Sequence, residues 1–132
     1  MRAATLLLIS CVVLAAAGCS SGPEDQPVRS VTARAGEPVR IAADEYRFDP
    51  NRIVVKRAGR GAATLRIVLA NRGSLAHNLH VRDGDRDLGS IQSFRPGEER
   101  SLSVRLQTGS YRFVCTVADH EELGMVGEIE VR

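Results

Sequence analysis

The sequence has little net charge, few cysteines and, after residue 17, no long hydrophobic run. Its formal net charge is +2 over 132 residues, and Arg2 supplies one of these charges. Binding to nucleic acid needs a concentrated basic surface, so this near-neutral chain argues against a nucleic-acid partner. No segment beyond the N-terminus is long or apolar enough to span a bilayer. The length leaves room for one modest domain.

The N-terminus predicts an export signal that ends at a lipid-modified cysteine. Met1-Arg2 is followed by an apolar stretch from Ala3 to Ala17, which is too short for a permanent transmembrane helix. Small residues then precede Cys19, in a pattern that resembles a bacterial lipobox. We therefore expect residues 1–18 to be a lipoprotein signal peptide and Cys19 to be diacylated. An ordinary secretory signal cleaved near the same place is the alternative.

Residues 19–38 are expected to form a flexible tether. They begin with a polar, turn-forming run and show no clear periodicity, and such a composition buries too little apolar surface to become ordered. A tether of about 18 residues reaches roughly 20–25 Å. The sequence therefore predicts a protein of the bacterial cell envelope, anchored by lipid on the extracytoplasmic side of a membrane, in the periplasm or at the cell surface.

From residue 39 to residue 132 the pattern is that of short β-strands. Alternating or compact apolar segments are separated by Gly, Pro, Asn and Asp, and no segment has a sustained helical period. The segments are 39–41, 53–55, 64–69, 79–81, 102–106, 111–115 and 129–131. The run from Asp83 to Asp87 lacks the remaining positions of an EF-hand and is interpreted as a polar hairpin turn. The sequence predicts a single all-β domain, a sandwich or a barrel.

Four side chains near the C-terminus and in one upstream strand suggest a metal site. Cys115, His120 and Met125 follow one another at intervals of five residues, and His77 lies upstream. Strand alternation places His77 and Cys115 on the core side of their strands and His80 on the opposite side. His120 and Met125 lie in a loop that must fold back over one end of the domain. Two His, one Cys and a distant Met form the ligand set of a mononuclear blue-copper site.

Each of these residues also has an ordinary interpretation. In isolation His120 could be a solvated loop residue and Met125 a core filler, but their joint spacing after Cys115 favours ligands. Cys115 could be a small buried hydrophobe. Cys11 leaves with the signal peptide and Cys19 is expected to be acylated, so Cys115 has no disulfide partner. An unpaired thiol in an oxidising compartment is unusual unless it is reactive or binds a metal, so the metal-ligand interpretation is preferred.

Three sequence motifs carry a resemblance to a known family. They are Tyr111-x-Phe113-x-Cys115-Thr116-x-x-x-His120 with Leu123-Gly124-Met125-x-Gly127, Asn71-x-Gly73-x-x-x-His77-Asn78, and Pro96-Gly97-Glu98. With them, residues 39–132 resemble the cupredoxins, the azurin and plastocyanin kind of small blue-copper protein, here in a bacterial lipoprotein form. Ala118 and Asp119 depart from the pattern, because many relatives have Pro and Gly there, and the loop spacing leaves the subfamily open.

The resemblance implies a Greek-key β-sandwich that binds one copper ion per chain. It implies that the ligands are His77, Cys115, His120 and Met125. It also implies that Asn78 ties the two ligand segments together by hydrogen bonds, and Thr116 is expected to support the ligands with it. Electrons would pass through the exposed edge of the His120 ring.

The predicted function is that of a type 1 (blue) copper protein, a monomer that carries one electron at a time between redox protein partners. An enzyme is not expected, because the sequence has no nucleophile elbow and the four ligands leave no open substrate position. A binuclear copper site would need two bridging thiolates. A copper chaperone, storage protein or sensor with the same ligands is the open alternative. Glu121 and Glu122 could steer a basic partner toward His120, or could be a solvated loop.

Overall fold

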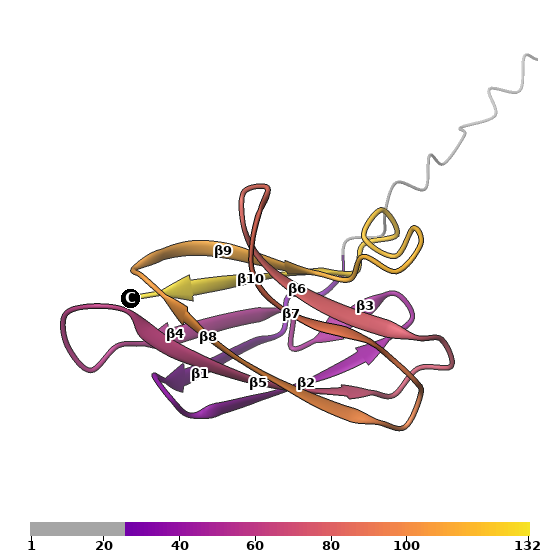
Figure 1. Cartoon of the computed structure of the whole chain (residues 1–132), viewed down its shortest axis with the longest axis horizontal. Coiled ribbons are helices and arrows are strands. Elements are labelled where there is room, and N and C mark those ends of the chain that lie inside the picture. Colours follow the sequence, from indigo (N-terminus) through magenta and orange to yellow (C-terminus); the bar gives the residue numbers. More distant parts are fainter. Residues whose placement is uncertain (1–25) are drawn as a thin grey trace, which may run out of the picture.

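The computed structural model describes residues 26–132, which form ten β-strands in two sheets that pack face to face (Figure 1). The predicted signal peptide, Cys19 and the first part of the predicted tether lie outside these residues. Among the described residues there is no helix that could cross a membrane. The strands are β1 (Ser30–Arg34), β2 (Pro38–Asp44), β3 (Arg47–Asp49), β4 (Arg52–Lys56), β5 (Ala63–Asn71), β6 (His77–Asp83), β7 (Arg86–Phe94), β8 (Glu99–Leu106), β9 (Gly109–Val114) and β10 (Val126–Val131).

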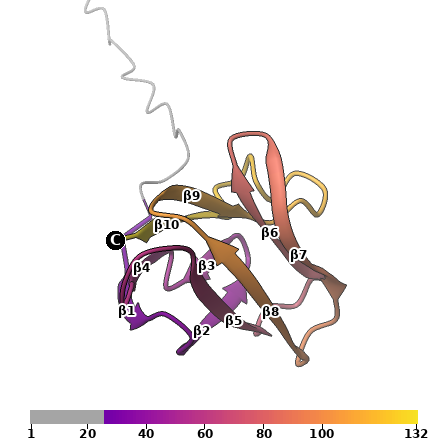
Figure 2. The same cartoon turned by 60° about the vertical axis from the view of Figure 1, so that its left-hand side comes forward.

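The chain passes repeatedly from one sheet to the other. One sheet has the strand order β1-β4-β10-β9-β6-β7, and the other has the order β3-β2-β5-β8. Figure 2 shows the two layers, with β9, β10 and β6 in one and β2, β5 and β8 in the other. The protein is a Greek-key β-sandwich, as predicted from the sequence.

The core lies between the sheets and follows from strand alternation. In β5, every second residue from Ala63 to Asn71 is buried. Burying one Leu, Ile, Val or Phe side chain contributes about 1.5–3 kcal/mol. The Phe48 and Phe113 rings meet in the core with centroids 5.1 Å apart. Gly127 is the cross-strand partner of Phe113, and a Cβ there would lie 2.1 Å from the Phe113 ring, so this position has no room for a side chain.

The folded domain begins earlier than the sequence predicts. Residues 30–34 form β1, which pairs with β4 in a parallel arrangement, so the prediction of a tether as far as residue 38 is wrong at its C-terminal end. Residues 26–29 already contact the folded domain, since the Arg29 amide donates to Asn51 Oδ1 over 2.8 Å. β1 is short and mostly exposed, so its apolar pattern is weak, and its order comes largely from its pairing with β4.

One end of the sandwich gathers the segments that carry the candidate ligands. β6 begins there, β9 ends there, and the β9–β10 loop (residues 115–125) folds over it next to β3 (Figure 1). The turn between β2 and β3 reaches the same end. The β6–β7 hairpin projects separately, and its two-residue connection Gly84-Asp85, with Gly84 at φ +58°, confirms the predicted polar turn.

Candidate metal centre

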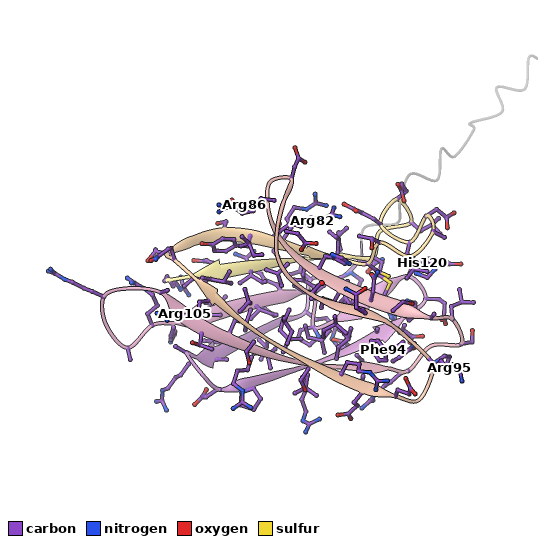
Figure 3. The ribbon with its side chains drawn as sticks, viewed as in Figure 1. Arg82, Arg86, Phe94, Arg95, Arg105 and His120 are labelled. Carbon is purple, nitrogen blue, oxygen red and sulfur yellow. The ribbon has the colours of Figure 1, made fainter. Side chains whose placement is uncertain are left out.

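Three of the four predicted ligands meet in one buried cluster. His77, Cys115 and His120 offer donor atoms that all lie within 4.8 Å of one another. Cys115 Sγ is 4.0 Å from His77 Nδ1 and 3.5 Å from His120 Nδ1. Both rings therefore turn the same nitrogen, Nδ1, toward the sulfur. Figure 3 shows His120 beside the sulfur-bearing side chains at this end of the sandwich.

Neighbouring strands bring His77 and Cys115 together. β6 and β9 pair antiparallel with His80 opposite Val114, so the start of β6 lies beside the residue that follows β9. His77 is the first residue of β6 and is buried with the core face of that strand, whereas His80 is only half-buried. The His80 ring contacts Asp87 across the β6–β7 hairpin and takes no part in the cluster.

His120 is brought back to the cluster by a turn within the β9–β10 loop. The His120 amide donates to the Val117 carbonyl over 3.0 Å, and Ala118 within this turn has φ +46°. Left-handed backbone is unfavourable for a residue with a Cβ. The structure thus contains a strained residue at a position where the sequence lacks the family's usual turn residues.

Met125 is held next to both loop ligands by the backbone. The Met125 amide donates to the His120 carbonyl over 2.9 Å, and the Cys115 amide donates to the Met125 carbonyl over 3.1 Å. The Met125 side chain is fully buried. These hydrogen bonds place the Met125 backbone beside Cys115 and His120, and the role of Met125 as a fourth ligand stays a prediction.

The buried polar residues of the described chain also lie at this end. There are four of them, namely Asn71, His77, Asn78 and His120. Burying a polar side chain is unfavourable unless it finds partners. Asn78 Nδ2 donates to Thr116 Oγ1 over 2.8 Å, and the Thr116 amide donates to Asn78 Oδ1 over 2.7 Å. Asn78 thus ties the two ligand segments together, as the resemblance implies, and Thr116 is its partner.

Burial sets the protonation of the cluster in the copper-free protein. Burial raises the pKa of the Cys115 thiol, and loss of hydration lowers the pKa of His77, although its hydrogen bond to Glu45 works in the opposite direction. At neutral pH the site therefore holds a neutral thiol and a neutral His77 ring. A metal that binds here must displace the thiol proton.

Two residues of the site are not found by the sequence reasoning. Glu45 and Tyr46 form the turn between β2 and β3, and each contacts one of the histidines. Glu45 Oε1 is 3.2 Å from His77 Nε2, and the Tyr46 ring meets the His120 ring edge to face with centroids 4.9 Å apart. No local pattern marks these two residues, because only the packing of the sheets brings them to ligands more than thirty residues away.

The two glutamates of the predicted acidic pair, Glu121 and Glu122, have different surroundings in the structure. Glu121 is paired with Arg82 at 3.3 Å and with Arg112 at 3.6 Å, so its charge is neutralised and it attaches the loop to β6 and β9. Of the two glutamates, Glu122 is the exposed one, and it takes no part in the ion pairs of Glu121. The idea that Glu121 presents free negative charge beside His120 is wrong. The His120 side chain is also largely covered, with 4% of its surface exposed.

The donor set fits a single metal ion that prefers soft and nitrogen ligands. Zn²⁺, taken as a guide to the size of a first-row ion, bonds to thiolate sulfur at about 2.3 Å and to imidazole nitrogen at about 2.0 Å. The sum of these lengths, about 4.3 Å, exceeds both sulfur-to-nitrogen separations, so one ion can bond to Cys115 and to either ring without moving them far. One Cys, two His and a neighbouring Met suit copper, because they stabilise both of its oxidation states.

Comparison with known proteins now identifies the family. The model of the copper-binding proteins of the plastocyanin/azurin family matches residues 37–132. The chain belongs to this family. It is a copper-binding cupredoxin, and His77, Cys115 and His120 form its candidate metal site.

Three similar proteins place this cupredoxin among its relatives. It is 31% identical over 119 residues to the copper-resistant cuproprotein CopI of Rubrivivax gelatinosus, covering 76% of this chain and 69% of CopI. It is 30% identical over 109 residues to the multicopper oxidase mco of Staphylococcus epidermidis, covering 69% of this chain but only 24% of the oxidase. Its fold matches auracyanin A of Chloroflexus aurantiacus with a TM-score of 0.60 and 19% identity, covering 78% of this chain and 99% of auracyanin A.

Proposed function

We propose that this cupredoxin is a mononuclear type 1 copper protein that carries single electrons. The observation that carries the proposal is the closed ligand cluster. His77, Cys115 and Met125 are fully covered and His120 is 4% exposed, so the candidate ligands are shielded from solvent. A carrier must gain and lose one electron with little rearrangement, and a rigid, buried ligand set supports this. Copper supplies the one-electron chemistry.

The residues of the chain would perform three tasks around the ion. Cys115 would supply a thiolate, His77 and His120 would supply imidazole nitrogens, and Met125 would supply a weaker thioether ligand. Asn78 and its hydrogen bonds to Thr116 keep the two ligand segments at a fixed separation. The His120 ring, which is 4% exposed and lies in the loop that covers the end of the sandwich, would be the route by which an electron enters and leaves.

A copper-handling role is the second candidate, and one observation favours it. The similar protein CopI is named as a copper-resistant cuproprotein. A chaperone, storage protein or sensor could use the same four ligands to exchange copper instead of electrons. The similarity to the multicopper oxidase spans 24% of that protein, so we do not extend its oxidase activity to this chain.

Copper release and electron self-exchange distinguish the two candidates. The loaded protein is mixed with an excess of a Cu(I) chelator, and the loss of copper is followed over time. Electron self-exchange between the oxidised and reduced protein is measured by NMR line broadening. Slow copper loss with rapid self-exchange supports the carrier. Rapid transfer of Cu(I) with slow self-exchange supports copper handling.

We also propose that the protein is anchored in the cell envelope through a lipid on Cys19, where it acts as a monomer with redox protein partners. The described chain begins at the copper end, because Gln26 Nε2 donates to the Tyr46 carbonyl over 3.1 Å. Six residues lie between Cys19 and Gln26, and the seven Cα-to-Cα steps that join the two span at most about 25 Å when extended. An anchor at Cys19 would therefore hold the copper end near the membrane surface and favour partners located there.

The anchor is tested by replacing the cysteine that carries it. Wild-type protein should partition with membranes and show a diacylglyceryl group by mass spectrometry, whereas Cys19→Ala should not be anchored. Recovery of wild-type protein wholly in the soluble envelope fraction, without lipid, would reject the anchor and leave the copper site unaffected.

A further inference from the structure

One carboxylate contacts a candidate copper ligand from the side that faces away from the cluster. His77 turns Nδ1 toward Cys115 Sγ, and its other ring nitrogen, Nε2, lies 3.2 Å from Glu45 Oε1. A metal bonded at Nδ1 leaves Nε2 protonated, so Nε2 donates to the carboxylate in the copper-bound state. Glu45 therefore does not bind the metal, but it contacts the imidazole that does.

Glu45 is itself fixed by the backbone that leads into β6. The amides of Ser74 and Leu75 both donate to Glu45 Oε1, over 2.8 and 2.9 Å. With His77 this gives one carboxylate oxygen three donors from the segment that carries the ligand. Donors of this kind stabilise the charged, carboxylate form of the Glu45 side chain.

The chain also leaves space for this carboxylate. A Cβ at residue 73 would lie 2.2 Å from Glu45 Oε1 and 2.9 Å from His77 Nε2, and Gly73 provides no such atom. The backbone at Gly73 is not left-handed, so only the lack of space excludes a side chain. The contact between Glu45 and His77 thus depends on the absence of a single methyl group.

We propose that Glu45 is a positioning residue of the copper site, which holds the His77 ring in place and shifts the redox equilibrium toward Cu(II). The inference rests on the proposed copper function. Partners that hydrogen-bond to a metal-binding histidine fix its orientation and increase its basicity as a ligand. A nearby negative charge stabilises the more highly charged state of the ion, which is Cu(II). Removing the charge should therefore favour Cu(I).

The test compares two variants with one matched control. Glu45→Gln keeps the shape and an oxygen acceptor but removes the charge. Gly73→Ala keeps the charge but places a Cβ 2.2 Å from Glu45 Oε1 and 2.9 Å from His77 Nε2, so it forces the carboxylate and the ring apart. Asp44→Asn removes the neighbouring carboxylate, which pairs with Arg47 and accepts from the Glu45 amide but does not touch His77. Each copper-loaded protein is equilibrated with the same redox mediator, and the ratio of Cu(I) to Cu(II) is read from its spectrum.

We expect Glu45→Gln and Gly73→Ala to increase the ratio of Cu(I) to Cu(II) about tenfold over wild type, which corresponds to about 59 mV for a one-electron couple. Cu(II) affinity should fall about 10- to 100-fold, as for other partners of metal-binding histidines. Asp44→Asn should change the redox ratio and the Cu(II) affinity less than Glu45→Gln does, because the Asp44 charge acts on His77 more weakly than that of Glu45 and without a hydrogen bond. In the copper-free protein, the amides of Ser74 and Leu75 should exchange faster in Gly73→Ala, which shows that the carboxylate has moved.

The outcomes separate this inference from the proposed function. If wild type shows the blue copper spectrum and both variants match it in redox ratio and Cu(II) affinity, Glu45 has no role at the site and the inference is overturned alone. The same holds if Asp44→Asn shifts the ratio as much as Glu45→Gln, because the effect would then be one of general charge. If wild type has no blue spectrum, the proposed function fails and this inference fails with it.

Discussion

Replacing Asn78 should weaken the link between the two ligand segments, and so lower the free energy of unfolding, without removing a ligand. The Asn78 side chain makes two hydrogen bonds to Thr116, of 2.8 and 2.7 Å, and is 8% exposed. Each such bond contributes about 0.5–1.5 kcal/mol. Asn78→Ala removes both and leaves the Thr116 amide without its partner. Because Thr116 is only half-buried, water can partly replace that partner, and the expected loss in the free energy of unfolding is about 2–3 kcal/mol.

The assay is urea unfolding of the copper-free protein, with Thr116→Val as the matched variant. For a slope of about 2 kcal/mol per M, Asn78→Ala should lower the midpoint by about 1 M. Thr116→Val removes one hydrogen bond and keeps the other, so it should cost about 1 kcal/mol. The double variant should cost little more than Asn78→Ala alone, because both changes affect the same pair. An unchanged midpoint in Asn78→Ala would refute the view that this pair joins the ligand segments.

Two further predictions follow from the loop and from the protonation of the site. Ala118 has φ +46°, so Ala118→Gly should relieve left-handed strain and increase the free energy of unfolding by about 1 kcal/mol in the same urea assay; a loss of stability would contradict this. Burial raises the pKa of Cys115 and lowers that of His77, so between pH 7 and 8 copper displaces one thiol proton and none from His77. The apparent Cu(II) affinity, measured by competition with a chelator, should therefore increase about tenfold per pH unit, and an affinity independent of pH would contradict the assignment.

The sequence predicts the ligand loop well because its information is local. Cys115, His120 and Met125 lie within eleven residues, and alternation in β9 and β6 predicts which side chains face the core. The same local information correctly separates His77 from His80. The family, the Greek-key sandwich and the cluster of His77, Cys115 and His120 could all be predicted in this way.

The parts that the sequence does not predict depend on distant packing. Glu45 reaches His77 only because β2 ends, and β3 begins, at the end of the sandwich where β6 starts. Glu121 is next to His120 in sequence, but its charge is neutralised by arginines from β6 and β9. β1 is ordered by pairing with the edge of β4, and its own apolar pattern is too short to indicate this. In each case the deciding contact joins segments far apart in the chain.

The most direct test of the account is the optical and EPR spectrum of the copper-loaded protein beside that of Cys115→Ser. Cys115 is the one cysteine among the described residues, and its sulfur lies within 4.0 Å of a ring nitrogen of each histidine. Wild type should bind one copper ion per chain and show an intense sulfur-to-copper charge-transfer band. Cys115→Ser should lose that band while circular dichroism shows an intact β-sandwich. A blue band that survives in folded Cys115→Ser, or that is absent from copper-loaded wild type, would contradict the assignment of a type 1 copper site.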